Sequence, residues 1–404
     1  MRRIAVQRAQ GVSPHVRRPN STRQRATPRP LSRQFSMPSA TSTASFSFIT
    51  PLHGLRGIAA LAVLLFHWSL LFSDANARLA QWSVPEVAWL NPTLLYSLGF
   101  EGVFLFFVLS GYLLTTALAY SPRPLSEHVL VPYLLRRSAR IYPAVWAQLG
   151  VLCAAGALLP GWPLNPLEQP LWPQILLWLH LPPGMHAPVN GVWWTLPVEL
   201  IFYLILPFLL VLMRRVGWRV VLLLAILLTA AWRQGVILTL SLDDYSGSVY
   251  KLDTTAGVLS SFVFGMCASE WMRSSYVRSP RHWIALGLTG VVACNIILMT
   301  NIGTYWRGGV LLVFWNTALS GCLALVVAGF AASTHRTVLD SRWMQWMGER
   351  SYGLYLWHLP VMYAALMGWP EIKSQIVTSL LIVLGTTALC AELSYRLVEG
   401  AAPA

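Results

Sequence analysis

The sequence has 404 residues, of which 55% are hydrophobic and only 11% are charged. Soluble domains carry about a quarter charged residues, so this composition excludes an ordinary water-soluble protein. The formal net charge of +14 raises the alternative of a nucleic-acid-binding protein. The basic residues, however, gather in the first 45 residues and in alternate connections between apolar runs. This distribution indicates membrane topology, and we expect no nucleic-acid partner.

Residues 1–45 contain nine arginines and no acidic residue, interleaved with Ser, Thr, Pro and Gln. Such a segment cannot bury enough apolar surface to fold alone, so we predict a disordered basic cytosolic tail followed by a transmembrane domain at 46–400. The composition also resembles an organellar transit peptide, and translation could instead start at Met37. No cleavable signal peptide precedes the first apolar run, which favours a retained signal anchor.

Apolar runs of membrane-spanning length follow. A hydrocarbon core of about 30 Å requires about 20 apolar residues in a helix. The sequence therefore predicts an all-α, polytopic integral membrane helix bundle with about ten transmembrane helices. The candidate spans are 52–73, 96–119, 141–160, 193–213, 219–240, 255–272, 282–300, 309–332, 350–369 and 374–396.

The arginines between these spans predict the orientation. With a cytosolic amino terminus, the inner connections hold thirteen arginines and the outer connections hold four basic residues. This asymmetry follows the positive-inside bias and puts both termini in the cytosol. The longest outer connection, 161–192, is rich in Pro and Trp, and we expect it to lie along the interface as a lid or acceptor-binding loop. The five cysteines lie inside apolar runs, and their spacing indicates neither a metal site nor a disulfide framework.

The first span contains Arg56 and His67, which lie 11 residues apart. Eleven helical steps of about 100° bring a side chain back to within about 20° of its starting direction, so the two share one face. Their axial separation of about 16.5 Å would put Arg56 at the cytosolic mouth and His67 beyond the midplane. An ionisable residue at that depth is costly, so we predict that His67 has a functional role. The alternatives are a snorkelling anchor for Arg56 and an interhelical hydrogen bond for His67.

Five segments together resemble the acyltransferase 3 family of membrane-bound O-acyltransferases. The first is the Arg56 and His67 pair within its span. The others, in chain order, are 102–112 (GVFLFFVLSGY), 136–143 (RRSARIYP), 193–203 (WWTLPVELIFY) and 351–358 (SYGLYLWH). The resemblance covers about 50–399. Thr195 replaces the serine usual after Trp, and Gly400 replaces the proline usual after Val398-Glu399.

The resemblance implies an enzyme of a bacterial inner (plasma) membrane. It would move an acyl group, typically acetyl, from cytosolic acyl-CoA to a hydroxyl of a polysaccharide or lipid-linked glycan, with no permanently bound cofactor. The implied donor-binding residues are Arg56, Arg137, Arg140, Ser110, Gly111 and His358. The arginines suit coenzyme A because their forked donors match phosphates. The alternatives are arginines that only set topology, helix packing at Ser110 and Gly111, and a structural role for His358.

Glu199 is the second candidate catalytic residue beside His67. If the fourth span begins at the outer surface near Trp193, Glu199 lies about 9 Å below that surface, which is the depth estimated for His67. A carboxylate bonded to the imidazole would fix its tautomer and stabilise the imidazolium. The rival interpretation is a buried ion pair between Glu199 and Arg233.

Two questions stay open at this point. His67 could act as general base on the acceptor hydroxyl, or could first accept the acyl group itself. A transporter of a lipid-linked sugar or small solute would also use intramembrane ionisable residues, although the sequence shows no inverted repeat.

Overall fold

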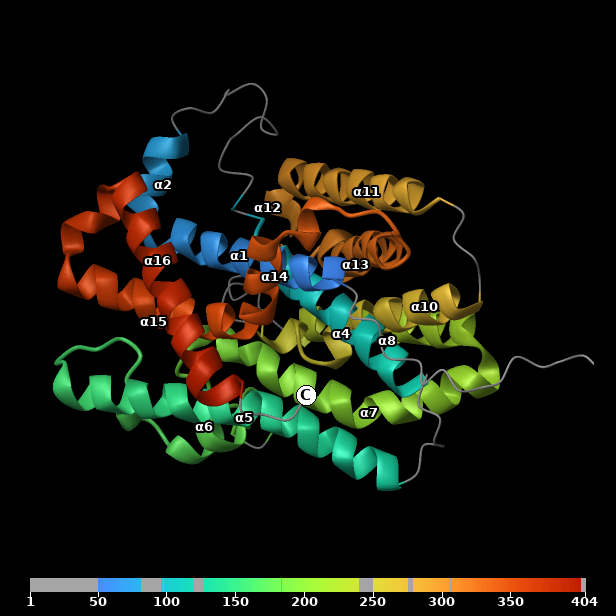
Figure 1. Cartoon of the computed structure of the whole chain (residues 1–404), viewed down its shortest axis with the longest axis horizontal. Coiled ribbons are helices and arrows are strands. Elements are labelled where there is room, and N and C mark those ends of the chain that lie inside the picture. The colour runs from blue at the N-terminus through green and yellow to red at the C-terminus, as the bar shows by residue number, and fades with distance from the viewer. Residues whose placement is uncertain are drawn as a thin grey trace, which may run out of the picture. The chain divides into compact units, whose positions relative to one another are not determined.

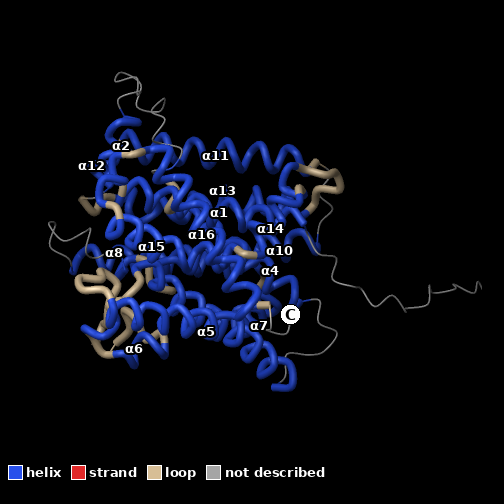
Figure 2. Tube along the Cα trace, turned by 60° about the vertical axis from the view of Figure 1, so that its left-hand side comes forward, coloured by secondary structure: helices blue, strands red, loops and turns tan. Residues whose placement is uncertain are grey.

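The computed structural model describes residues 50–80, 96, 98–119, 127–182, 184–239, 250–274, 279–305 and 307–400. Within these ranges the chain forms helices joined by turns and loops, with no strand (Figure 2). The predicted all-α membrane fold is therefore confirmed. The tail predicted at 1–45 lies outside the described residues.

Each of the ten predicted spans corresponds to one long helix (Figure 1). These helices are α1 (Thr50–Leu71), α4 (Glu101–Ala119), α5 (Glu127–Leu158), α7 (Thr195–Val216), α8 (Trp218–Thr239), α10 (Leu259–Ser274), α11 (Pro280–Thr300), α13 (Val310–Ala331), α15 (Ser351–Gly368) and α16 (Ile376–Ser394). Among the described residues, eight helices are long and apolar enough to cross a membrane. The other two are α10, which has only 16 residues, and α15, whose 18 residues include polar and aromatic side chains such as His358 and three tyrosines. The membrane side of each terminus stays a prediction.

Four short α-helices lie in the described connections: α2 (Ser73–Ala80), α6 (Leu171–Leu176), α12 (Ile302–Tyr305) and α14 (Arg342–Glu349). Short 3-10 helices and a final π-helical turn, Tyr395–Glu399, also occur among the described residues. The connection that holds α6 packs along α5. The Tyr142 hydroxyl donates to Leu176 O at 3.1 Å and the Trp146 indole donates to Ile175 O at 2.9 Å. This long connection is thus fixed to the second half of α5 by side chains that satisfy its carbonyls.

Helix α1 packs against α4, α14 and α15. Its glycines allow this close approach. A Cβ added at Gly57 would lie 2.8 Å from Met347 Cβ of α14, and one added at Gly102 of α4 would lie 2.4 Å from Ala59 O. Small residues at helix contacts are typical of membrane bundles, where packing holds helices together. Helix α14 packs beside the first turns of α1. The first residue of α15, Ser351, therefore lies level with Arg56 and not with the start of α1.

Gly111 belongs to the contact between α4 and α10. A Cβ at Gly111 would lie 2.0 Å from Phe262 O, and a Cβ at Gly265 would lie 2.0 Å from Val108 O. The two glycines therefore provide reciprocal close contacts between the helix backbones. Gly111 is buried here and does not line the pocket described below. Its position supports the packing alternative considered from the sequence.

Substitution of Gly111 tests this contact. Gly111→Ala should lower the free energy of unfolding by about 1–3 kcal/mol, because the new methyl group would force two backbones apart. Gly385→Ala is the matched control, since no heavy atom lies within 4 Å of its added Cβ. Thermal melting of both purified variants provides the measurement. Equal melting temperatures for the two variants would contradict the assignment.

Candidate active site

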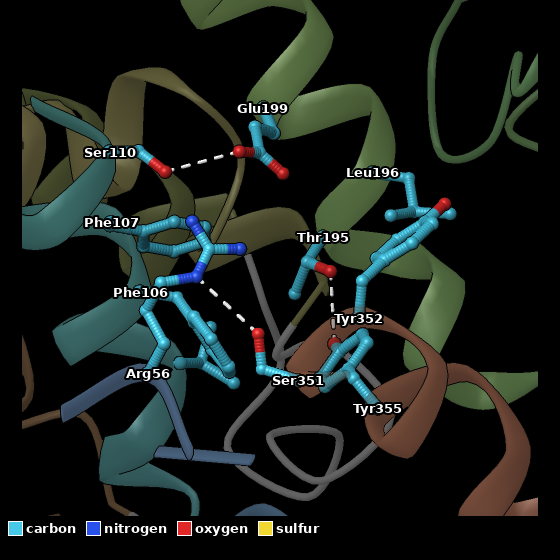
Figure 3. A pocket seen from close by; sticks show the side chains of 11 residues that line it. Arg56, Phe106, Phe107, Ser110, Thr195, Leu196, Glu199, Ser351, Tyr352 and Tyr355 are labelled. Carbon is cyan, nitrogen blue, oxygen red and sulfur yellow. Dashed lines mark hydrogen bonds between the residues drawn. The ribbon is translucent and has the colours of Figure 1, made fainter. Parts of the chain in front are cut away.

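A pocket lies between α1, α4, α7 and α15, with about 500 Å³ of space free of protein atoms (Figure 3). Three residues singled out in the sequence converge on it: Arg56, Ser110 and Glu199. The complete lining is Arg56, Val103, Phe106, Phe107, Ser110, Thr195, Leu196, Glu199, Ser351, Tyr352 and Tyr355. The polar and charged side chains form one wall, and aromatic rings flank it on two sides (Figure 3).

The polar wall is held by hydrogen bonds between helices. Arg56 Nε donates to Ser351 Oγ at 3.4 Å, and Ser110 Oγ donates to Glu199 Oε1 at 3.1 Å. The Tyr203 hydroxyl, one turn along α7, also donates to Glu199. Figure 3 shows the Arg56 guanidinium projecting into the pocket between the Glu199 side and Ser351. Glu199 thus accepts hydrogen bonds from two hydroxyl groups on the side of the pocket that faces the Arg56 guanidinium (Figure 3).

Arg137 and Arg140 of α5 lie near the same pocket. Their charges act on Arg56, as does that of Glu199. Arg137 Nε is buried without a hydrogen-bond partner among the described residues, whereas Arg140 is exposed. The structure thus brings the three predicted arginines into one electrostatic neighbourhood. Glu399 lies near the same arginines, since the charges of Arg140 and Arg56 act on its carboxyl group.

His67 and His358 form a hydrogen-bonded pair that the sequence did not predict. His358 Nε2 lies 3.1 Å from His67 Nδ1. In addition, His67 Nδ1 lies 2.9 Å from Val63 O, and His358 Nδ1 lies 3.2 Å from Leu354 O. Carbonyl oxygens only accept, so each Nδ1 carries a hydrogen. His67 Nδ1–H is therefore shared between Val63 O and the His358 lone pair, and the lone pair of His67 lies on Nε2.

Tyr355 connects this histidine pair with the pocket. Its ring lines the pocket, and its centroid lies 6.0 Å from that of His358. The Tyr355 ring also contacts Phe106, with ring centroids 6.0 Å apart. Tyr355 OH donates to Val192 O at 2.8 Å, which fixes the ring. The histidine pair is consequently separated from the Arg56 and Glu199 pocket by one immobilised aromatic side chain.

The predicted hydrogen bond between His67 and Glu199 is absent, because Glu199 is bonded to Ser110 and Tyr203 instead. The depth estimate was wrong at the start of α7. Thr195 Oγ1 lies 2.9 Å from Tyr355 OH, so α7 begins level with the second turn of α15. The segment before it enters the bundle, where Asn190 donates to Leu356 O at 3.0 Å. Glu199, one turn further, therefore reaches the level of Arg56.

The rival pairing of Glu199 with Arg233 is also absent. Arg233 Nη1 donates to Asp253 Oδ1 at 2.6 Å, and its Nε donates to Leu312 O at 2.8 Å. Asn316 donates to the same carboxylate at 3.3 Å. The side chain of Arg233 is only 1% exposed, so the pair compensates a charge that lipid and protein could not solvate.

This ion pair yields a stability prediction. Arg233→Met leaves Asp253 buried without its cation and should cost about 3–5 kcal/mol. The double variant Arg233→Met, Asp253→Leu removes both charges and should recover much of that loss. Melting temperatures in detergent or nanodiscs measure both effects. A double variant less stable than Arg233→Met would show that the two side chains do not act as a charge pair.

Several residues of the site were not singled out from the sequence. Ser351, Tyr355 and Tyr203 lie inside segments that carried the family resemblance, but nothing in their type or spacing assigned them a role. Glu399 likewise follows the last span, between Val398 and Gly400, and nothing in its position assigned it a role. Only the three-dimensional contacts connect these side chains with Arg56 and Glu199.

The helix bundle and its buried polar site define a polytopic membrane protein with ionisable side chains among its apolar helices. Residues 50–395 match the acyltransferase 3 family, described as an acyltransferase domain. The chain therefore belongs to this family, as its motifs suggested. Together with the apolar helices, this membership makes it an integral membrane acyltransferase of a bacterial plasma membrane.

Curated relatives extend the comparison. The chain is 28% identical over 381 residues to peptidoglycan O-acetyltransferase OatA of Listeria monocytogenes, covering 89% of this chain and 56% of the relative. It is 23% identical over 373 residues to O-acetyltransferase OatA of Staphylococcus aureus, covering 87% and 57%. The chain thus spans about half the length of the curated relatives it matches. No solved structure matches it significantly.

Proposed function

We propose that this protein transfers an acetyl group from cytosolic acyl-CoA to a hydroxyl of a cell-wall polysaccharide. The observation that carries the chemistry is the histidine pair, which leaves a lone pair on His67 Nε2 while Nδ1 stays bonded. The acceptor is suggested by the names of the relatives, which describe O-acetylation and, for the Listeria protein, peptidoglycan.

The donor side of the proposal rests on the arginines. Coenzyme A carries phosphates, Arg56 lines the pocket, and the charges of Arg137 and Arg140 act on Arg56 from α5. Arg137 Nε has no partner among the described residues and can bond a phosphate oxygen. The pantetheine arm would then follow the aromatic side chains of the pocket lining toward Tyr355 and the histidine pair. Glu199 positions Arg56 in this scheme and does not contact His67.

The proposed chemistry uses His67 Nε2 as the reactive atom. As a general base, it takes the proton of the acceptor hydroxyl while the hydroxyl oxygen bonds to the acyl carbon. The carbon–sulfur bond breaks, and the coenzyme A thiolate leaves and recovers a proton from the imidazolium. The alternative route forms an acyl-histidine at the same nitrogen, which the acceptor then attacks. In both routes, Val63 O and His358 Nε2 stabilise the positive charge that develops on the His67 ring.

The transporter alternative has less support. Family membership favours an enzyme, and the buried cation at Arg233 is paired with Asp253 instead of facing a pathway. A histidine whose tautomer is fixed by two acceptors suits proton transfer to a bound substrate.

The histidine pair is tested by kinetics with purified protein. His67→Ala should reduce acetyl transfer by at least about a hundredfold, the usual contribution of a general base. His358→Ala should lower kcat while leaving the KM for acetyl-CoA near the wild-type value, because it removes an acceptor from His67 Nδ1–H. The double variant should be hardly slower than His67→Ala, since residues of one catalytic unit are not additive.

His335→Ala is the matched control, because His335 is an exposed histidine outside the bundle core. If the rate loss of the double variant equalled the product of the two single-variant losses, the proposed pair would be overturned. Full activity of His67→Ala, in correctly inserted protein, would overturn the catalytic role of His67 itself.

Donor binding provides a separate test. Replacing both Arg137 and Arg140 with Ala should weaken coenzyme A binding about tenfold or more, because charge-assisted hydrogen bonds to phosphate are lost. The matched control replaces Arg214 and Arg215, two exposed arginines at the end of α7, with Ala. Calorimetric titration of coenzyme A measures both. Equal coenzyme A affinity in the two double variants would show that Arg137 and Arg140 do not bind the donor and only set the membrane topology.

A further inference from the structure

A second cavity lies on the other side of α7. It is enclosed by α7, the end of α8 and two outer connections, with about 1070 Å³ of space free of protein atoms. Its aromatic lining consists of Trp194, Trp232, Tyr250 and His180. Polar groups of Lys251, Asp253 and Thr254 complete its rim. None of these side chains has a part in the proposed acetyl-transfer step.

The aromatic rings are held in fixed orientations. His180 and Tyr250 stack with centroids 4.0 Å apart and an interplanar angle of 16°. The Trp232 indole donates to Lys251 O at 3.0 Å. Thr255 Oγ1 donates to Val198 O at 3.4 Å, which attaches the 250–256 segment to α7. Preformed, largely apolar cavities with a few convergent polar groups are typical of ligand sites.

Two buried polar atoms at this cavity lack partners among the described residues: His180 Nδ1 and Thr254 Oγ1. Burial lowers the pKa of His180, so its ring is neutral at pH 7. A buried polar atom without a partner costs free energy that a bound hydroxyl or amide would recover. His180 also has φ of 54°, a left-handed backbone conformation that non-glycine residues rarely adopt and that clusters at ligand sites.

From these features we infer that the cavity binds the sugar rings of the acceptor glycan. A pyranose ring has an apolar C–H face that stacks on aromatic rings and a rim of hydroxyls that bond polar atoms. The lining offers the aromatic ring of Trp232, the stacked rings of His180 and Tyr250, and hydrogen-bonding groups at His180 and Thr254. A lipid chain alone would satisfy the apolar wall but would leave both polar atoms without partners.

The location suits an acceptor subsite of the proposed enzyme, on which this inference rests. Trp194 lines the cavity, and its ring lies 6.4 Å from Phe107, which lines the Arg56 and Glu199 pocket. The first turns of α7 thus contribute residues to both cavities: Pro197 and Val198 to this one, and Leu196 and Glu199 to the other.

Glycan binding can be measured without donor, on full-length protein in nanodiscs. The probes are tetra-N-acetylchitotetraose and a polyprenyl-diphosphate-linked N-acetylglucosamine disaccharide, titrated separately to distinguish a polymer from a lipid-linked source. His180→Asn removes the ring and tolerates the positive φ, and Tyr250→Leu removes its stacking partner. Both variants should weaken binding of the accepted probe about tenfold and raise its KM, with the KM for acetyl-CoA unchanged.

Trp172→Ala is the matched control, because Trp172 belongs to the same outer connection and packs on His186 but does not line the cavity. It should bind the probe like the wild type. Failure of both probes to bind the wild type, or unchanged affinity in both His180→Asn and Tyr250→Leu, would overturn the inference. Acetyl transfer by the wild type is scored separately, so a protein that binds glycan but transfers no acetyl group would contradict only the proposed function.

Discussion

A polar group inside the hydrocarbon region must find its partner within the protein, and this constraint governs the structure. The two histidine rings satisfy each other and carbonyls of their own helices. Arg233 is enclosed by a carboxylate and a backbone carbonyl. Where the constraint is not met, as at Arg137 Nε, the atom lies beside the proposed coenzyme A site. Satisfied groups thus build the scaffold around the histidine pair and Arg233, and Arg137 Nε, without a partner among the described residues, lies where the proposed donor would bind.

Close backbone approach makes these contacts possible. The glycines at the contacts of α1 with α4 and α14 bring three helices together with little side-chain volume between them. The residues that need partners can then meet across helix boundaries at hydrogen-bonding distance. Van der Waals packing and polar contacts therefore support each other, because neither water nor lipid supplies an alternative partner.

The sequence predicted the helices and much of the pocket, because apolar runs are long and the family motifs carry Arg56, Ser110 and Glu199. It did not predict which residues meet at a given depth. That depends on where each helix begins relative to its neighbours, and a short segment such as α14 or 190–194 displaces a whole helix. The partner of Arg233 was missed for a related reason, since Asp253 lies in a connection that follows no helical period.

The histidine pair has one consequence for the behaviour of the protein in different membranes. Each ring is bonded through Nδ1 to a carbonyl four residues earlier in its own helix, so neither ring can turn freely to follow a moving partner. Displacing α1 by one residue along its screw axis would rotate His67 by about 100° and separate the rings. The hydrogen bond between the two rings therefore depends on the alignment of α1 with α15. In the proposed mechanism, a change of bilayer thickness that shifted one helix along the other would alter proton transfer at His67.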